Sequence, residues 1–155
     1  MQWHQVLTNP ALKNLPFKIE LDRLGQLLMS PASNAHGAIQ ADLAALLKNK
    51  FKRRGRVYSE CSIQTQDGVR VADVAWASGA FVAQHADATP FPAAPELCIE
   101  IVSPSNSKAA IANKVRLYFS QGAHEVWVVT LKRVVTVYIG GKPAERSGLV
   151  GRIDI

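Results

Sequence analysis

The chain has 155 residues, of which 48% are hydrophobic and 19% charged, and it carries a formal net charge of +6 at pH 7. That length and apolar content suffice for a single domain, residues 1–155, with a core of its own. The longest apolar runs fall far short of the ~20 residues of a membrane-spanning helix, and the N-terminus lacks a signal-peptide pattern. We therefore expect a cytoplasmic protein with no membrane partner, whose positive charge favours a polyanionic ligand.

The first 30 residues predict a lead-in followed by a β-hairpin. Residues 1–16 hold scattered apolar positions between prolines, which favours a short helix or an irregular segment. Phe17–Leu21 alternates in polarity, Asp22–Gly25 has turn composition, and Gln26–Met29 returns. Glu20 lies on this hairpin, where an exposed strand glutamate is the commoner case and membership of an acidic cluster is the alternative.

A helix is predicted after the turn-rich connection over residues 30–37, and it ends near Phe51. Its inward stripe consists of Ile39, Leu43, Leu46, Leu47 and Phe51. His36 and Gln40 lie one turn apart at the start of the helix, where both would face a site. A capping or surface histidine is the commoner case.

Six cations crowd the end of this helix and the turn around Gly55. This basic cluster consists of Lys48, Lys50, Lys52, Arg53, Arg54 and Arg56. Cations at a helix C-terminus favour the macrodipole, and most such clusters are simply solvated. The alternative is a nucleic-acid-binding surface that neutralises phosphates and binds in a salt-dependent way. Because Phe51 is the only aromatic residue among these cations, base stacking is not indicated.

Two carboxylates interrupt strands that otherwise have core composition. Asp73 lies in the predicted strand Val69–Trp76, which forms a hairpin with residues 57–65, and Glu100 lies in the predicted strand Leu97–Val102. An unpaired ionised carboxylate is costly to bury, so each acid needs a proton, an ion pair or a bound cation. Separate structural ion pairs are the ordinary explanation. Two such acids on neighbouring strands favour a shared cation instead.

The second half of the chain predicts further elements of the same sheet. Residues 77–95 are broken by glycine and prolines apart from a short helix near residues 81–83, and we expect a substrate-side loop there. A turn over Ser103–Ser107 precedes a helix over Lys108–Gln121, and Lys114 lies beside the buried stripe of that helix. Strands over residues 125–130 and 134–139 follow, with a further short strand in the tail.

The order of elements predicts an α/β (α+β) fold with a mixed central sheet flanked by helices. Cys61 and Cys98 lie in strand-like runs without metal-ligand spacing, so we expect buried thiols.

Several blocks of the sequence together resemble the Uma2 family of restriction endonucleases, within the PD-(D/E)XK nuclease superfamily. The blocks are Gly68–Trp76, Pro95–Ser105, Lys114–Tyr118 and Gly122–Trp127, together with Met29–Pro31 and His36–Gly37. The resemblance covers nearly the whole chain. The combination of the Glu-Ile-Val-Ser-Pro-Ser block with the Lys-x-x-x-Tyr and Gly-x-x-x-Val-Trp patterns is specific, whereas a single short motif would not be.

This resemblance implies a restriction-endonuclease-like core of four mixed strands flanked by helices, with an N-terminal hairpin and added C-terminal strands. It also implies Asp73 and Glu100 as ligands of Mg²⁺ or Mn²⁺, with the backbone carbonyl of Ile101 as a further ligand and Glu20 as an additional one. The substrate it implies is nucleic acid, DNA in the first instance. Residues expected to line the site are His36, Gln40 and Ser103.

Two positions depart from the family pattern. Ala72 replaces the proline before the first acid, and Val102 stands where the superfamily has its lysine. Family members tend to carry that lysine on the next helix, so the resemblance assigns its role to Lys114. The catalytic set is then Asp73, Glu100 and Lys114: the acids fix the ion, and the lysine orients water and offsets developing charge.

Three functions remain open from the sequence: a metal-dependent DNA endonuclease, a nuclease-fold binding or regulatory module without turnover, and an interaction protein whose acids pair with arginines. Because the chain ends soon after Gly151, where relatives continue, we expect either a homodimer that completes the fold or a shortened tail. If the acids repel each other without metal, Asp73→Asn should raise the melting temperature.

Overall fold

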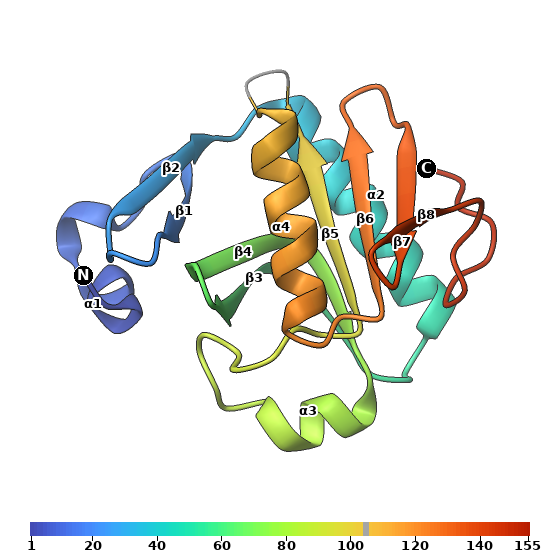
Figure 1. Ribbon diagram of the computed structural model, residues 1–155, viewed down its shortest axis with the longest axis horizontal. Coiled ribbons are helices and arrows are strands. Elements are labelled where there is room, and N and C mark those ends of the chain that lie inside the picture. The colour runs from blue at the N-terminus through green and yellow to red at the C-terminus, as the bar shows by residue number, and fades with distance from the viewer. Residues whose placement is uncertain (104–105) are drawn as a thin grey trace.

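An eight-stranded, mainly antiparallel sheet forms the centre of the computed structural model, which describes residues 1–103 and 106–155 (Figure 1). The strand order is β2-β1-β4-β5-β6-β7-β8, with β3 paired to β4 outside this path. Among the strands that the structure describes, β5 and β6 are the one parallel pair, and α4 lies between them in the chain. The elements are α1 (Trp3–Thr8), a 3₁₀ turn (Pro10–Leu12), β1 (Phe17–Leu21), β2 (Leu27–Pro31), α2 (Asn34–Phe51), β3 (Arg56–Thr65), β4 (Gly68–Ala77), α3 (Gly79–His85), β5 (Leu97–Val102), α4 (Lys108–Ser120), β6 (Glu125–Thr130), β7 (Val135–Ile139) and β8 (Lys142–Ala144).

Helices α2 and α4 cover opposite faces of the sheet (Figure 1). Ser33 caps α2 and Ser107 caps α4, each by accepting a hydrogen bond from a backbone N–H in the first turn. The buried stripe of α2 packs on β4, β5, β6 and β7, and Leu46 lies at its half-buried margin. Tyr118 and Val115 of α4 pack on the other face with the buried thiols Cys61 and Cys98.

The predicted elements are confirmed, and their boundaries lie within two residues of those predicted, except that α2 begins at Asn34, inside the turn-rich connection expected over residues 30–37. The hairpin, the two long helices and the later strands all form, and α3 extends the short helix expected near residues 81–83 to Gly79–His85. Of the turn expected over Ser103–Ser107, positions 104–105 lie outside the described residues. Within the described part of the chain, no helix has the length and apolar content needed to cross a membrane.

Strand β4 forks the sheet, because two strands share one of its edges. Near its start it pairs with β1 through Leu21↔Val69, and near its end it pairs with β5 over Val74–Trp76. Gly68 allows the close approach of β1, since a Cβ there would lie 2.3 Å from the carbonyl oxygen of Leu21. The fork leaves a gap between the two ladders, and the side chains described next fill it.

Candidate active site

Asp73 and Glu100 meet where the β4–β5 ladder ends. The last pair of that ladder is Val74↔Ile99, and continuing the register places Asp73 opposite Glu100. One oxygen of each acid is already engaged: Oδ2 of Asp73 accepts the N–H of Ile101 at 2.6 Å, and Oε1 of Glu100 accepts the hydroxyl of Tyr118. Oδ1 of Asp73 and Oε2 of Glu100 therefore face the gap.

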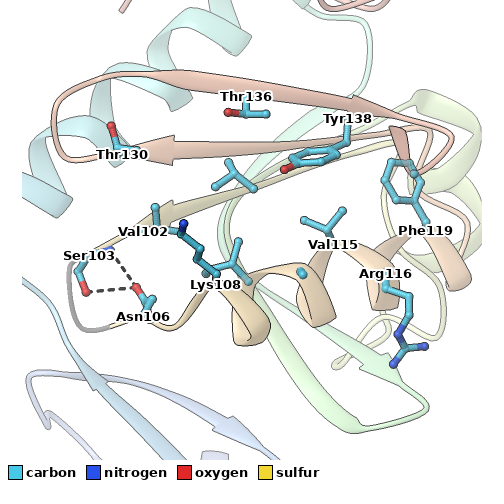
Figure 2. Close-up of a pocket in the computed structure, with 14 residues that line it drawn as sticks. Val102, Ser103, Asn106, Lys108, Val115, Arg116, Phe119, Thr130, Thr136 and Tyr138 are labelled. Atoms are coloured by element: carbon cyan, nitrogen blue, oxygen red, sulfur yellow. Dashed lines mark hydrogen bonds between the residues drawn. The ribbon is translucent and has the colours of Figure 1, made fainter. Parts of the chain in front are cut away.

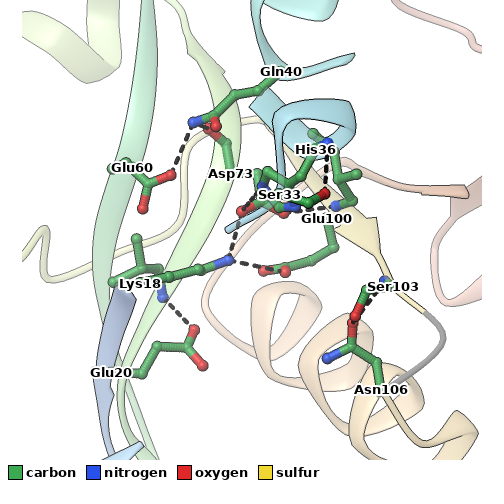
Figure 3. Close-up of polar contacts among 12 residues, drawn as sticks. Lys18, Glu20, Ser33, His36, Gln40, Glu60, Asp73, Glu100, Ser103 and Asn106 are labelled. Atoms are coloured by element: carbon green, nitrogen blue, oxygen red, sulfur yellow. Dashed lines mark hydrogen bonds and ion pairs between the residues drawn. The ribbon is translucent and has the colours of Figure 1, made fainter. Parts of the chain in front are cut away.

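Lys18 lies between these two oxygens. Its Nζ is 2.8 Å from Oδ1 of Asp73 and 3.2 Å from Oε2 of Glu100 (Figure 3). The Asp73 side chain is 0% exposed and that of Lys18 is 11% exposed, so the ion pair is largely withdrawn from solvent. The two acids share the ammonium of Lys18, and neither is paired with an arginine of the part of the chain that the structure describes.

Lys114 joins a third acid to the cluster. Its Nζ lies 2.8 Å from Oε1 of Glu20 and 3.1 Å from Oε2 of Glu100. The same oxygen of Glu20 accepts the N–H of Val71, a backbone group that the fork leaves without a strand partner on that edge. Glu20 thereby anchors the hairpin to β4 and fixes Lys114 beside the acid pair, and it is 6% exposed rather than a surface residue.

His36 and Gln40 reach the site from the start of α2 (Figure 3). Nε2 of His36 lies 3.2 Å from Oδ1 of Asp73. The amide of Gln40 donates to the carbonyl oxygen of Asp73 at 2.9 Å and to the carboxylate of Glu60 at 2.8 Å. Glu60 adopts a left-handed backbone, φ 53°, and the β3–β4 register skips the pair it would form with Asp73. Gln40 thus replaces a lost ladder bond and holds the backbone of Asp73.

The charges of the cluster set the protonation of the acids. Burial opposes ionisation of Asp73, but Lys18, together with hydrogen bonds from His36 and Ile101, lowers the pKa of Asp73 to about 2. Burial raises the pKa of Glu100 above its ordinary value, although Lys114 and Lys18 oppose the shift. Burial would lower the pKa of Lys18, but Glu100 and Asp73 more than offset it and raise that pKa. At neutral pH the pair Lys18–Asp73 is therefore fully charged.

A solvent-open groove of about 950 Å³ runs over the cluster. Its lining includes Phe17 and Met29 of the hairpin, Ser103 directly after β5 and Lys114 of α4. Ser103 donates its backbone N–H to Asn106 at the end of β5. Lys18, Lys114 and Glu100 all line the groove, so a ligand in it would contact the charged groups directly.

Val102, at the position of the superfamily lysine, lines a different cavity. That cavity has a volume of about 710 Å³, lies between α4 and the β5–β7 part of the sheet, and contains Ile111, Val115 and Phe119 (Figure 2). An apolar side chain suits this lining. The lysines of the site come instead from α4, as Lys114, and from β1, as Lys18.

The basic cluster does not join this site. It lies at the C-terminal end of α2, whereas His36 and Gln40 lie at the N-terminal end (Figure 1). All six of its cations are exposed. Any contact they make with a polyanion therefore lies at the opposite end of α2 from the acid pair.

Two residues that contact the acid pair, Lys18 and Tyr118, were not predicted from the sequence as site residues. Lys18 looks like one of the solvated positions of an alternating hairpin strand, and Tyr118 looks like part of the buried stripe of α4. The spacing Lys18-x-Glu20 places both side chains on one face of β1, which is the only local signal for Lys18.

The oxygen atoms of the acid pair suit a hard divalent cation. Magnesium is commonly held by one or two carboxylates and keeps several waters, and both oxygens here already converge on one positive charge. Among residues 1–103 and 106–155, no group of three His, Cys, Asp or Glu side chains is arranged to hold a metal ion. An ion here would therefore depend on Asp73 and Glu100, with the carbonyl of Ile101 and water as further ligands.

Comparisons with known proteins identify the family and the fold of this chain. A sequence model of the Uma2 family, described as "Putative restriction endonuclease", matches residues 4–146. Among solved structures, the chain is similar to "a putative nuclease belonging to DUF820" from Anabaena variabilis, with a TM-score of 0.69 and 21% identity over 80% of this chain and 73% of that one. No curated protein matches the sequence. The structural likeness establishes a nuclease fold.

Proposed function

Since the chain belongs to the Uma2 family of restriction endonucleases, we propose that it hydrolyses phosphodiester bonds in DNA with the help of a divalent metal ion, Mg²⁺ or Mn²⁺. The observation that carries this proposal is the convergence of Oδ1 of Asp73 and Oε2 of Glu100 on a single cation position. Two buried acids aimed at one point are the arrangement that a metal-dependent nuclease needs.

Asp73 and Glu100 would hold the ion, with the backbone carbonyl of Ile101 beside them. When bound, the ion supplies Lewis-acid stabilisation of the charge on the phosphoryl oxygens. Lys114 is held by Glu20 and Glu100 at the wall of the groove, where its ammonium would orient the attacking water and offset negative charge in the transition state. Gln40 would keep the backbone of Asp73 in place, and His36 would orient its carboxylate.

A second candidate is a nuclease-fold module that binds nucleic acid without turnover. One observation favours it: the ammonium of Lys18 already occupies the position between the two acids. The two candidates differ in whether DNA is cut.

The test is incubation of the purified protein with supercoiled plasmid and Mg²⁺ or Mn²⁺, followed by gel analysis of nicked and linear products. We expect nicking by the parent and a loss of at least about 100-fold in Asp73→Asn and Glu100→Gln, because each removes a charged ligand. Asp154→Asn, an exposed acid at the C-terminus, is the matched control and should cut normally. Salt-sensitive DNA binding without nicking would support the second candidate.

Lys114→Met tests the assigned lysine in the same assay. A variant that is folded, binds DNA and nicks at the parental rate would refute a catalytic role for Lys114. Nicking that persists equally in the parent and in both acid variants would point to a contaminating nuclease and would overturn the proposal.

A further inference from the structure

Lys18 occupies the position between the acids where a divalent ion would have to lie. This inference rests on the proposed function, because it concerns the metal that the proposed reaction needs. We propose that Lys18 is a positioning residue that serves as an internal counter-ion: it holds Asp73 and Glu100 together in the metal-free protein, and a divalent ion binds only when the Lys18 ammonium withdraws.

On each acid, the oxygen that faces the gap is the one that Lys18 contacts. Ile101 and Tyr118 engage the other oxygen of each acid, so Lys18 and an incoming ion compete for Oδ1 of Asp73 and Oε2 of Glu100. Magnesium binds oxygen at about 2.1 Å, which would place it within about 5 Å of Nζ if the lysine stayed where it is. Two cations at that separation repel each other strongly in a poorly solvated gap, so the Lys18 ammonium must leave its position between the acids.

The side chain of Lys18 can leave the position between the acids by way of the groove. The hairpin is fixed to β4 at Leu21↔Val69 and through Glu20, and Lys18 lies beyond both anchors, where its strand partner is Ser30 of β2. Its side chain lines the open groove. A lysine has a flexible four-carbon stem, so the ammonium can turn from the acids into the groove without moving the strand. There it would face the phosphates of a bound substrate.

Lys114 does not fill the same role. Its ion pairs are with Glu20 and Glu100, and it has none with Asp73 among the described residues. An ion that bridges the acid pair can therefore leave Lys114 in contact with Glu20. Among the described residues, Lys18 is the lysine that contacts both Oδ1 of Asp73 and Oε2 of Glu100, whereas Lys114 shares Oε2 alone.

The experiment is calorimetric titration of Mn²⁺ into the parent, Lys18→Met and Lys13→Met. Lys13 is an exposed lysine of the same N-terminal region, so its substitution removes the same charge away from the acids. If Lys18 must withdraw before the ion binds, its removal should tighten Mn²⁺ binding about tenfold or more, whereas Lys13→Met should bind like the parent. Asp73→Asn should abolish Mn²⁺ binding in the parent and in both lysine variants.

The outcomes separate this inference from the proposed function. Equal or weaker Mn²⁺ binding by Lys18→Met, with normal binding by the parent, overturns the counter-ion role and leaves the metal site intact. Binding by Lys18→Met alone supports the role. Absence of Mn²⁺ binding from the parent and from Lys18→Met overturns both proposals.

A second measurement on the parent protein covers the case in which Lys18→Met does not fold. Lysines are acetylated briefly with and without Mn²⁺, and the modified sites are quantified by mass spectrometry. Without metal, Lys18 should react more slowly than Lys13. Saturating Mn²⁺ should raise the rate at Lys18 several-fold and leave the rate at Lys13 unchanged; a rate at Lys18 that Mn²⁺ does not alter contradicts the inference.

Discussion

The hydroxyl of Tyr118 donates a hydrogen bond to Oε1 of Glu100, and both side chains are almost completely buried. Tyr118→Phe leaves that carboxylate oxygen without its donor in a place that water does not reach. We expect the free energy of unfolding, measured by urea titration, to fall by about 1–3 kcal/mol.

Tyr58→Phe is the matched control for that prediction. The hydroxyl of Tyr58 is buried and has no hydrogen-bond partner among the described residues, so its removal should leave stability unchanged or slightly raised. If both variants lose the same stability, the bond from Tyr118 to Glu100 contributes nothing of its own.

Asp73→Asn should lower the melting temperature of the metal-free protein. The sequence alone predicted the opposite if the acids repelled each other, but Lys18 lies between them and Asp73 carries its charge in an ion pair. Breaking a buried ion pair costs about 3–5 kcal/mol. Because Lys18 remains paired with Glu100 in the variant, we expect the free energy of unfolding to fall by an amount near the lower end of that range. Thermal melts in EDTA measure it, and a higher melting temperature for Asp73→Asn would contradict the ion pair.

His36 should make stability depend on pH. Its hydrogen bond to Asp73 raises the pKa of His36 above its ordinary value of 6.5, although burial opposes the shift. A raised pKa in the folded state gives a stabilisation that is complete below the unfolded-state value and is lost as the pH rises through the folded-state value. The stability difference between the parent and His36→Gln in EDTA should therefore be largest near about pH 5.5 and shrink toward alkaline pH. A difference that is constant with pH would exclude the protonated histidine.

The basic cluster should affect how DNA affinity depends on salt. Replacing three of its exposed cations by glutamine removes up to three phosphate contacts. The negative slope of log K against log salt should therefore become shallower by about 2–3. The triple variant is Lys50→Gln, Arg53→Gln and Arg56→Gln, and the matched control replaces Lys13, Lys142 and Arg146. Equal slopes for the two triple variants would mean that the cluster is simply solvated.

The sequence predicted the elements of the fold because each has a local signal. Alternation marks β1, the spacing of Ile39, Leu43 and Leu47 marks α2, and serine caps mark the starts of α2 and α4. The fork at β4 has no such signal. It depends on which strands share an edge, and that is decided by packing across the whole sheet.

For the same reason the sequence predicted the acids and not the cation between them. Asp73 and Glu100 stand out as charges within apolar strands, whereas Lys18 sits in a strand that alternates and looks solvated. Only the approach of β1 to β4 turns that position toward the acids. A buried carboxylate can be identified from its own strand, but its partner from a distant segment cannot.

The length of helix α2 sets the shortest DNA duplex that can contact the acid pair at one end of the helix and the basic cluster at the other. From His36 to Lys52 the helix rises about 24 Å, which equals the rise of about seven base pairs of B-form DNA. A shorter duplex can reach the acid pair or the basic cluster but not both, so affinity for a series of duplexes should step upward at about that size.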